Sequence, residues 1–323
     1  MSPQEAAFFR EADPWGFILF ARNVADPAQL AALTRDLRNA VGRDAPVFVD
    51  QEGGRVERLG PPHWRTWLPP LEQVGMNKRH AVRAMYLRYR LIADELRAVG
   101  IDGNCAPVAD IAGVDTHPVL KNRCYGQDAV KVAEIAGSVA QALLDGGVLP
   151  MVKHLPGQGR ADLDSHQELP RVTAKKKALR WRDFMAFEPL AELPIGMTAH
   201  VVYEAYDPDH PATQSREILR LIRKKLGFKG LMVTDDLSMQ ALSGTLAERA
   251  RLSLAAGCDI ALHCNGERAE MEAVAAASGR LEGAPLARAE RALGWRRPPL
   301  PIDIEAAEAE FLSLMRGQAG VDG

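Results

Sequence analysis

One segment of the sequence carries residues whose types and spacing suit acid–base chemistry. An apolar run ends in Lys153-His154, and a loop rich in glycine and aspartate then carries Asp164 and His166. Residues two apart in an extended backbone project to the same side, so the Asp164 carboxylate can orient the His166 imidazole and stabilise its protonated form. Such a pair suits a general acid/base. From these residues alone, a loop whose Asp and His only bond its own backbone is an equally good interpretation.

A second segment offers a nucleophile. The apolar run Leu231–Thr234 stops at Asp235-Asp236. Adjacent residues at a strand end point in opposite directions, so one carboxylate can face an active site while the other caps a helix or anchors a neighbouring loop. The alternative, that both carboxylates are caps, is open at this point.

A third group of polar residues could bind a polar ligand. Asp50 ends another apolar run, and the glycine pair that follows permits a tight turn that brings Arg58 back toward it. An Asp–Arg pair suits bidentate hydrogen bonding to the vicinal hydroxyls of a sugar, and a structural salt bridge is the alternative. Arg123 and His200 are further polar candidates, although a lone histidine such as His200 is more often a buried residue with satisfied hydrogen bonds.

These residues follow apolar runs that we expect to be buried parallel strands, because the runs are continuous rather than alternating. The expected strands are Gly16–Phe20, Pro46–Asp50, Asp102–Ile111, Leu149–His154, Ile195–Val202, Leu231–Thr234 and Asp259–His263. Helical patterns separate them. Asp26 and Ser215 are predicted to cap the starts of two helices, and Gly100 and Gly227 to follow the ends of two.

Repeated strand–helix units with polar residues at many strand ends predict an α/β fold of the TIM (β/α)-barrel type in a single catalytic domain over residues 1–323. A doubly wound open sheet is the competitor, but the polar strand ends are too many for one switch point. Only seven strands are found, so the barrel is expected to lack its first strand. The C-terminal part, residues 285–323, is expected to be a helical appendage, with Glu305–Met315 in a helical pattern.

Composition excludes several classes of protein. The formal net charge is -2, with 40 basic residues scattered along the chain, which does not favour a nucleic acid or an anionic membrane as a partner. No apolar run approaches a membrane span, and no secretory signal is visible. The four cysteines show no disulfide or metal-binding spacing. We therefore expect a cytoplasmic protein, and a monomer.

Several motifs together resemble the bacterial β-N-acetylhexosaminidases of glycoside hydrolase family 3. They are K-H-L-P-G-Q-G-R-A-D-L-D-S-H, V-T-D-D-L-S-M, I-L-F-A-R-N, D-Q-E-G-G-R-V-E-R, C-A-P-V-A-D and M-T-A-H-V-V-Y, in order between about residues 16 and 265. The resemblance implies that Asp235 is a covalent nucleophile, and that His166 is the acid/base with Asp164 assisting it. By the same matching, the sugar subsite would be lined by Asp50, Arg58, Arg123, Lys153 and His154.

The family's usual substrate class implies that this chain removes N-acetylglucosamine from peptidoglycan fragments, N-acetylglucosaminyl-1,6-anhydro-N-acetylmuramic acid with or without its peptide. No metal or other cofactor is implied. The sequence departs from the family where histidine is common, at Gln158, and where an aromatic residue is common, at Leu155. Relatives also begin with an additional strand that is absent here, which would explain the count of seven.

Two other functions are compatible with the same residues. A metal-dependent barrel hydrolase could use His154, His166, His200 and Asp235 as ligands, although their spacing matches no metal motif. A sugar-binding relative that has lost catalysis is the non-enzymatic alternative, which turnover of a chromogenic N-acetylglucosaminide would exclude.

Overall fold

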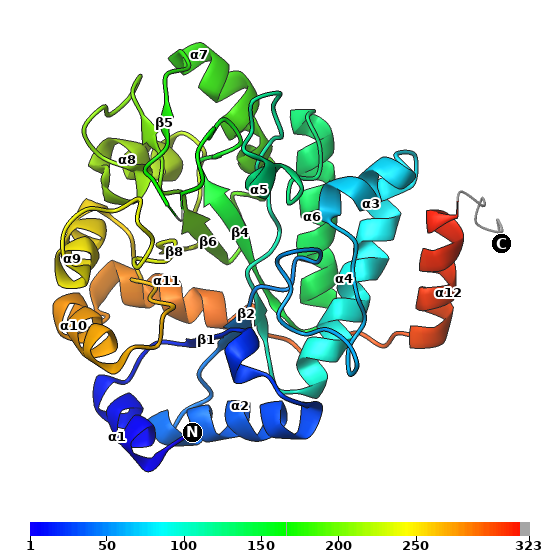
Figure 1. Cartoon of the computed structure of the whole chain (residues 1–323), viewed down its shortest axis with the longest axis horizontal. Coiled ribbons are helices and arrows are strands. Elements are labelled where there is room, and N and C mark those ends of the chain that lie inside the picture. The colour runs from blue at the N-terminus through cyan, green and yellow to red at the C-terminus, as the bar shows by residue number, and fades with distance from the viewer. Residues whose placement is uncertain (166, 317–323) are drawn as a thin grey trace. The chain divides into compact units, whose positions relative to one another are not determined.

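The computed structural model describes residues 1–165 and 167–316. Its contacts divide the chain into two compact units. The first comprises Met1–Pro107, Gly137–Pro150 and the chain from Trp295 onward, and the second comprises Val108–Ala136 and Met151–Gly294. Both units combine parallel strands with helices (Figure 1), which confirms the expected α/β class, whereas a barrel that lacks its first strand stays a prediction.

The first unit contains parallel strands in the order β1-β2-β3-β4. The strands are β1 (Phe17–Leu19), β2 (Val47–Val49), β3 (Gly103–Asn104) and the beginning of β4 (Leu149–Leu155). All of β2 is buried, as expected from its continuous apolar run. Among the described residues, β1 pairs with a strand on one side only.

The predicted strand Asp102–Ile111 is wrong in its length. Only Gly103 and Asn104 pair as β3, and the Asn104 side chain then donates to the Gln51 carbonyl oxygen and accepts from the Gln51 N–H. A side-chain amide thus replaces further backbone pairing at this point. Val108 makes an isolated parallel bridge to Lys153 in the second unit.

Local signals place the helices of the first unit. The Asp26 carboxylate accepts a hydrogen bond from Gln29 N, and α2 ends at Gly42 in the left-handed conformation. The predicted glycine at the end of the next long helix is also present, since Gly100 has φ +79°. The helices are α1 (Pro3–Ala12), η1 (Ala21–Asn23), α2 (Pro27–Val41), α3 (Pro70–Met76), α4 (Ala81–Ala98), the second half of α6 (Ala129–Asp145) and α12 (Ile304–Met315).

The predicted C-terminal helix is confirmed as α12, red in Figure 1, which packs against α4. Arg65 contacts Glu308 on α12 at 2.8 Å and Glu95 on α4 at 2.7 Å. Arg83 on α4 contacts Glu310 at 2.7 Å. The helix is therefore joined to the rest of the first unit by ion pairs as well as by apolar packing.

In the second unit the remainder of β4 pairs with β6 (Ile195–Thr198), and β6 pairs with β8 (Leu231–Val233), all in parallel. A separate two-stranded parallel sheet joins β5 (Arg171–Val172) to β7 (Val202–Tyr203). The predicted strand Ile195–Val202 is therefore two short strands in different sheets.

The last predicted strand, Asp259–His263, is reduced to one parallel bridge between Val233 and Ile260. Beyond Ile260, the Leu262 N–H bonds to the Thr234 hydroxyl rather than to a backbone carbonyl. This side-chain acceptor ends the ladder after one bridge, which an apolar run in the sequence cannot indicate.

The helices of the second unit lie before, between and after these strands along the chain. Ser215 caps α8 as predicted, since its hydroxyl accepts from Ile218 N. The helices are α5 (Pro118–Lys121), the first half of α6, α7 (Lys176–Ala178), the π-helix η2 (Leu179–Phe184), η3 (Met185–Leu190), η4 (Ala212–Gln214), α8 (Arg216–Lys224), α9 (Leu246–Ala256), α10 (Arg268–Ser278) and α11 (Gly283–Leu293).

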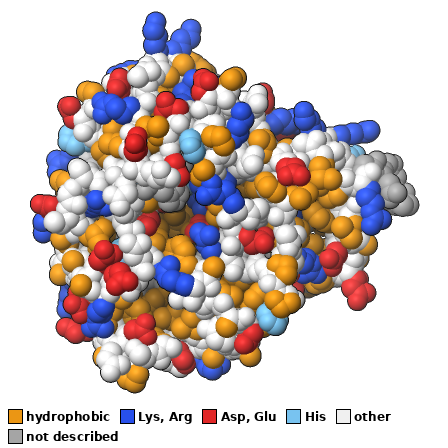
Figure 2. Space-filling model, viewed as in Figure 1, with side chains coloured by type: hydrophobic (Ala, Val, Ile, Leu, Met, Phe, Trp, Pro, Cys, Tyr) orange, Lys and Arg blue, Asp and Glu red, His pale blue; other side chains and the backbone are white. Residues whose placement is uncertain are grey.

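Basic and acidic side chains are interspersed over the face shown in Figure 2, in keeping with the small net charge of the chain. Across residues 1–165 and 167–316, no helix is both long and apolar enough to cross a lipid bilayer.

Candidate active site

The charged pair at the end of β4 is buried within the second unit, with Lys153 and His154 only 1% and 2% exposed. His154 Nδ1 lies 2.7 Å from Oδ2 of Asp110, a carboxylate with no exposed surface. A buried carboxylate beside a histidine fixes the imidazole tautomer and its orientation. On the other side of the ring, Nε2 of His154 lies 3.5 Å from Arg123 Nη2.

Asp110 is a site residue that the sequence reasoning missed. It is the last residue of the motif C-A-P-V-A-D, which had indicated the family but had received no role. Its second oxygen accepts from the backbone N–H of Gln158 at 2.7 Å. Asp110 therefore links the imidazole of His154 to the loop that carries the predicted acid/base residues. The signal in the sequence was the aspartate at the end of an apolar run, because a charged side chain that becomes buried there needs a partner.

The two aspartates after β8 have different environments, as the alternation at a strand end predicted. Asp236 accepts from the backbone N–H groups of Ser238 and Cys264 and from the Ser238 hydroxyl, so it anchors the following loop. Among the described residues, Asp235 accepts one hydrogen bond, from the N–H of Asp236 at 2.8 Å. The Asp235 carboxylate is therefore the one left available for chemistry.

The surroundings of Asp235 keep it ionised. Burial acts to raise the pKa of this carboxyl. Electrostatic interactions with His154 and His200 oppose burial, and the N–H of Asp236 and the charge of Lys153 add to them. The net result is a pKa below the usual value for an aspartate. An anionic carboxylate at neutral pH is what a nucleophile needs.

His200 is a buried histidine whose two ring nitrogens both have hydrogen-bond partners, as the sequence analysis favoured for a lone histidine. Its Nδ1 lies 2.8 Å from the Thr213 hydroxyl, and its Nε2 lies 3.0 Å from the carbonyl oxygen of Asp236. Burial lowers the pKa of His200, although the charge of Asp235 acts against this. The neutral ring then donates from Nε2 to the Asp236 carbonyl, so His200 holds the backbone directly after Asp235.

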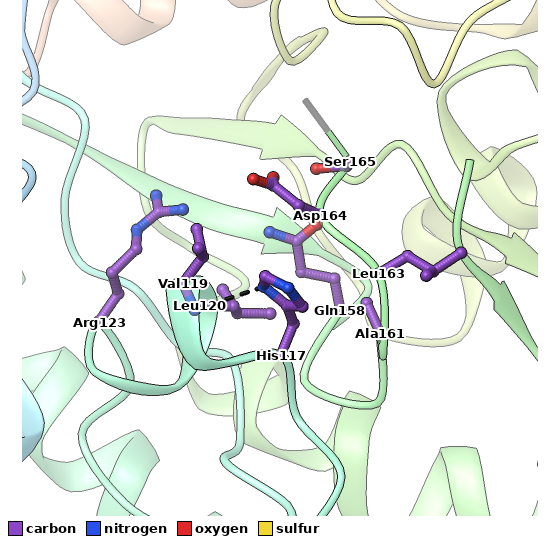
Figure 3. Close-up of a pocket in the computed structure, with 9 residues that line it drawn as sticks. All are labelled: His117, Val119, Leu120, Arg123, Gln158, Ala161, Leu163, Asp164 and Ser165. Atoms are coloured by element: carbon purple, nitrogen blue, oxygen red, sulfur yellow. Dashed lines mark hydrogen bonds between the residues drawn. The ribbon is translucent and has the colours of Figure 1, made fainter. Parts of the chain in front are cut away.

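Asp164 lines a pocket in the second unit with an empty volume of about 280 Å³, open to solvent (Figure 3). The pocket also contains Arg123, so the structure brings these two predicted site residues together. Its lining residues are His117, Val119, Leu120, Arg123, Gln158, Ala161, Leu163, Asp164 and Ser165. The partner predicted for Asp164, His166, lies outside the described residues.

The start of this loop is held firmly by the rest of the second unit. The buried Tyr203 hydroxyl donates to the Gly157 carbonyl at 2.8 Å, and Arg160 Nε lies 2.7 Å from Asp183. Gly159 packs so closely that a Cβ there would lie 2.0 Å from the Ile111 carbonyl oxygen. The backbone before Asp164 is therefore positioned by contacts on both sides, and Gly159 cannot be replaced without moving it.

The other predicted sugar-binding pair, Asp50 and Arg58, lies in the first unit. Arg58 Nη2 lies 3.2 Å from Asp50 Oδ2, and both side chains are partly buried. The Arg58 guanidinium also lies over the Phe20 ring, 5.2 Å from its centroid. The intervening turn uses Gly53 and Gly54, both with positive φ, as the sequence predicted.

The environments of two histidines disfavour the metal-dependent alternative. Both ring nitrogens of His200 face protein hydrogen-bonding partners, and His154 has a carboxylate on one side and a guanidinium on the other. A guanidinium opposite Nε2 would repel a cation bound there. Among residues 1–165 and 167–316, no three His, Cys, Asp or Glu side chains are grouped as a metal site, and the proposed ligand His166 is outside this range.

The motifs and the site geometry agree with the comparison to protein families. The glycosyl hydrolase family 3 N-terminal domain matches residues 6–292. The chain belongs to glycosyl hydrolase family 3.

Family 3 relatives with similar sequences are bacterial β-hexosaminidases. The chain is 35% identical over 325 residues to one from Pseudomonas aeruginosa (strain LESB58), which covers 100% of this chain and 96% of the relative. It is 36% identical over 273 residues to one from Bordetella avium, covering 82% and 77% of the two chains.

Solved structures of family 3 enzymes share the fold. NagZ from Neisseria gonorrhoeae, in complex with N-trifluoroacetyl-D-glucosamine, superposes with a TM-score of 0.82 at 30% identity, covering 99% of this chain and 94% of that one. A β-N-acetylglucosaminidase from Paenibacillus sp. gives a TM-score of 0.79 at 32% identity, and this chain spans 60% of its length.

Proposed function

We propose that this family 3 protein is a retaining β-N-acetylglucosaminidase that acts through a covalent glycosyl-enzyme on Asp235. The observation that carries the proposal is the contrast between the two adjacent aspartates. Among the described residues, Asp236 accepts three hydrogen bonds, two from Ser238 and one from Cys264, whereas Asp235 accepts one and has a lowered pKa. The named relatives, β-hexosaminidases and β-N-acetylglucosaminidases, support the choice of reaction.

The reaction follows the two steps of retaining glycosidases. The Asp235 carboxylate attacks the anomeric carbon and forms an ester bond to it while the glycosidic C–O bond breaks. His166 donates its proton to the departing oxygen, with Asp164 stabilising the imidazolium before the transfer. The neutral His166 then takes a proton from water, whose oxygen attacks the same carbon and releases Asp235 as a carboxylate.

The other predicted residues bind and orient the sugar. Lys153 and His154 add positive potential beside Asp235, and Asp110 holds the His154 ring. Arg123 offers a charged donor for hydroxyl groups. The Asp50–Arg58 pair, which the sequence predicts to bind sugar, offers a donor and an acceptor of the same kind. Positioning of this kind can supply several kcal/mol of the rate enhancement.

The substrate that we propose is N-acetylglucosamine β-linked to 1,6-anhydro-N-acetylmuramic acid, with or without the peptide. A Neisseria gonorrhoeae relative binds an N-acylated glucosamine, which supports an N-acyl sugar in the site. We also propose that the protein works as a cytoplasmic monomer. All four cysteines are free thiols, and three of them are buried, which suits a reducing compartment.

Hydrolysis of an aryl N-acetyl-β-glucosaminide, followed by ¹H NMR in D₂O, tests the proposal. We expect release of the aryl alcohol with the β-anomer of N-acetylglucosamine formed first, before mutarotation. The α-anomer as first product would exclude a retaining mechanism, and activity abolished by a chelator would favour the metal-dependent alternative. Absence of turnover would favour a sugar-binding protein.

A further inference from the structure

Gln158 lies in the pocket that Asp164 also lines, and the oxygen of its carboxamide is unsatisfied. The residue is 4% exposed, and its Oε1 has no hydrogen-bond partner in the part of the chain that the structure describes. A buried acceptor without a donor destabilises the folded protein, so such groups are rare and often functional. The carboxamide is directed into the same space as the Asp164 carboxylate (Figure 3).

The backbone of Gln158 is held by hydrogen bonds and by close packing on both sides. Its N–H donates to Asp110 at 2.7 Å, and its carbonyl accepts from Ala161 N at 2.8 Å. On either side, Gly157 is bonded by Tyr203 and Gly159 packs directly on Ile111. The backbone at Gln158 is therefore fixed, and only the side chain has to turn for its oxygen, which is covered in this structure, to meet a ligand.

Four apolar side chains also line the pocket. We call them together the apolar wall of the pocket: Val119, Leu120, Ala161 and Leu163. An acceptor for one N–H beside a small apolar surface is complementary to an acetamido group, which has an amide N–H and a methyl. A hydroxyl group in the same place has no methyl and would make no contact with the apolar wall.

The position of the pocket agrees with this ligand. Asp164 also lines it, and in the proposed function Asp164 supports the group that protonates the glycosidic oxygen on C1. The substituent on the neighbouring carbon, C2, therefore lies within reach of this pocket, and in N-acetylglucosamine that substituent is the acetamido group.

We propose that Gln158 is the specificity-determining residue for the 2-acetamido group, with Oε1 accepting its N–H and the apolar wall contacting its methyl. This inference rests on the proposed function.

The test compares Gln158→Leu, Gln158→Glu and Gln158→His on an aryl N-acetyl-β-glucosaminide and on the matching aryl β-glucoside. Gln158→Leu removes the acceptor at nearly constant size, so we expect kcat/KM for the N-acetyl substrate to fall about ten- to a hundredfold. Activity on the glucoside should stay within about twofold. Gln158→Glu and Gln158→His keep an acceptor and should retain most of the discrimination. Gln127→Leu, at an exposed glutamine of the same unit, is the matched control.

Equal losses on the two substrates, or no loss on the N-acetyl substrate, would overturn the inference. Where the glucoside is turned over too slowly to measure, competitive inhibition by N-acetylglucosamine and by glucose gives the same comparison. If the unsubstituted chain does not hydrolyse the N-acetyl substrate, the proposed function fails separately. Calorimetric binding of N-acetylglucosamine then still tests the pocket, and equal affinity of the Gln158→Leu variant would overturn the inference.

Discussion

Replacing Asp110 with asparagine tests the buried network that supports the active site. The substitution keeps the size of the side chain and one carbonyl acceptor, which can still receive the Gln158 N–H. It places an NH₂ group against His154 Nδ1, where the carboxylate had accepted at 2.7 Å. Moving the His154 proton to Nε2 would relieve that contact but would set an N–H against the Arg123 guanidinium, 3.5 Å away. Either tautomer leaves one pair of donors facing each other.

A buried donor without an acceptor costs ~1–3 kcal/mol, and a hydrogen bond to a charged group contributes a similar amount. We therefore expect Asp110→Asn to lower kcat/KM about ten- to a hundredfold on an aryl N-acetyl-β-glucosaminide, and to lower the free energy of unfolding by ~1–3 kcal/mol.

Steady-state kinetics and urea unfolding measure the two effects. Asp115→Asn, at an exposed aspartate nearby in the sequence, should change neither by more than about twofold or ~0.5 kcal/mol. The reasoning would be refuted if Asp110→Asn were as active as the unsubstituted chain, because His154 would then need no orientation.

Three further changes probe other parts of the site. Asp236→Ala removes the acceptor of three hydrogen bonds, so unfolding in urea should show a loss of ~1–3 kcal/mol, and an unchanged midpoint would contradict the anchoring role. His154→Ala removes a positive influence that lowers the pKa of Asp235, so the acid limb of the kcat/KM profile should move to higher pH, whereas a shift to lower pH would reverse the sign that we assign. His166→Ala should slow substrates with poor leaving groups far more than activated aryl glycosides, with a milder pattern for Asp164→Ala, and equal losses across leaving groups would argue against proton donation.

Features set by neighbouring residues in the sequence could be predicted. The caps Asp26 and Ser215 act on backbone groups three residues away, and both are present. The opposite directions of Asp235 and Asp236 follow from strand alternation, and the structure has them with different partners. In each case the physical cause lies within one turn or one strand, so one segment of sequence contains it.

Features that join distant segments could not be predicted. Asp110 bonds to His154 because Val108 and Lys153 bridge in parallel, a register that neither segment reveals alone. The strand expected at Asp259–His263 shortens to one bridge because the Thr234 hydroxyl takes the next N–H. Side chains that replace backbone partners are decided by tertiary contact, which hydrophobic patterns do not encode.

Covalent trapping at Asp235 tests the central claim most directly. The chain is incubated with a 5-fluoro-N-acetyl-β-glucosaminyl fluoride, a substrate whose glycosyl-enzyme forms faster than it is hydrolysed, and then digested for mass-spectrometric peptide mapping. We expect one equivalent of label on the peptide that contains V-T-D-D-L-S-M, with fragmentation assigning it to Asp235. The Asp235→Asn variant, with Asp236 intact, should take up no label. Label on Asp236, or turnover of the substrate with no carboxylate labelled, would contradict the account.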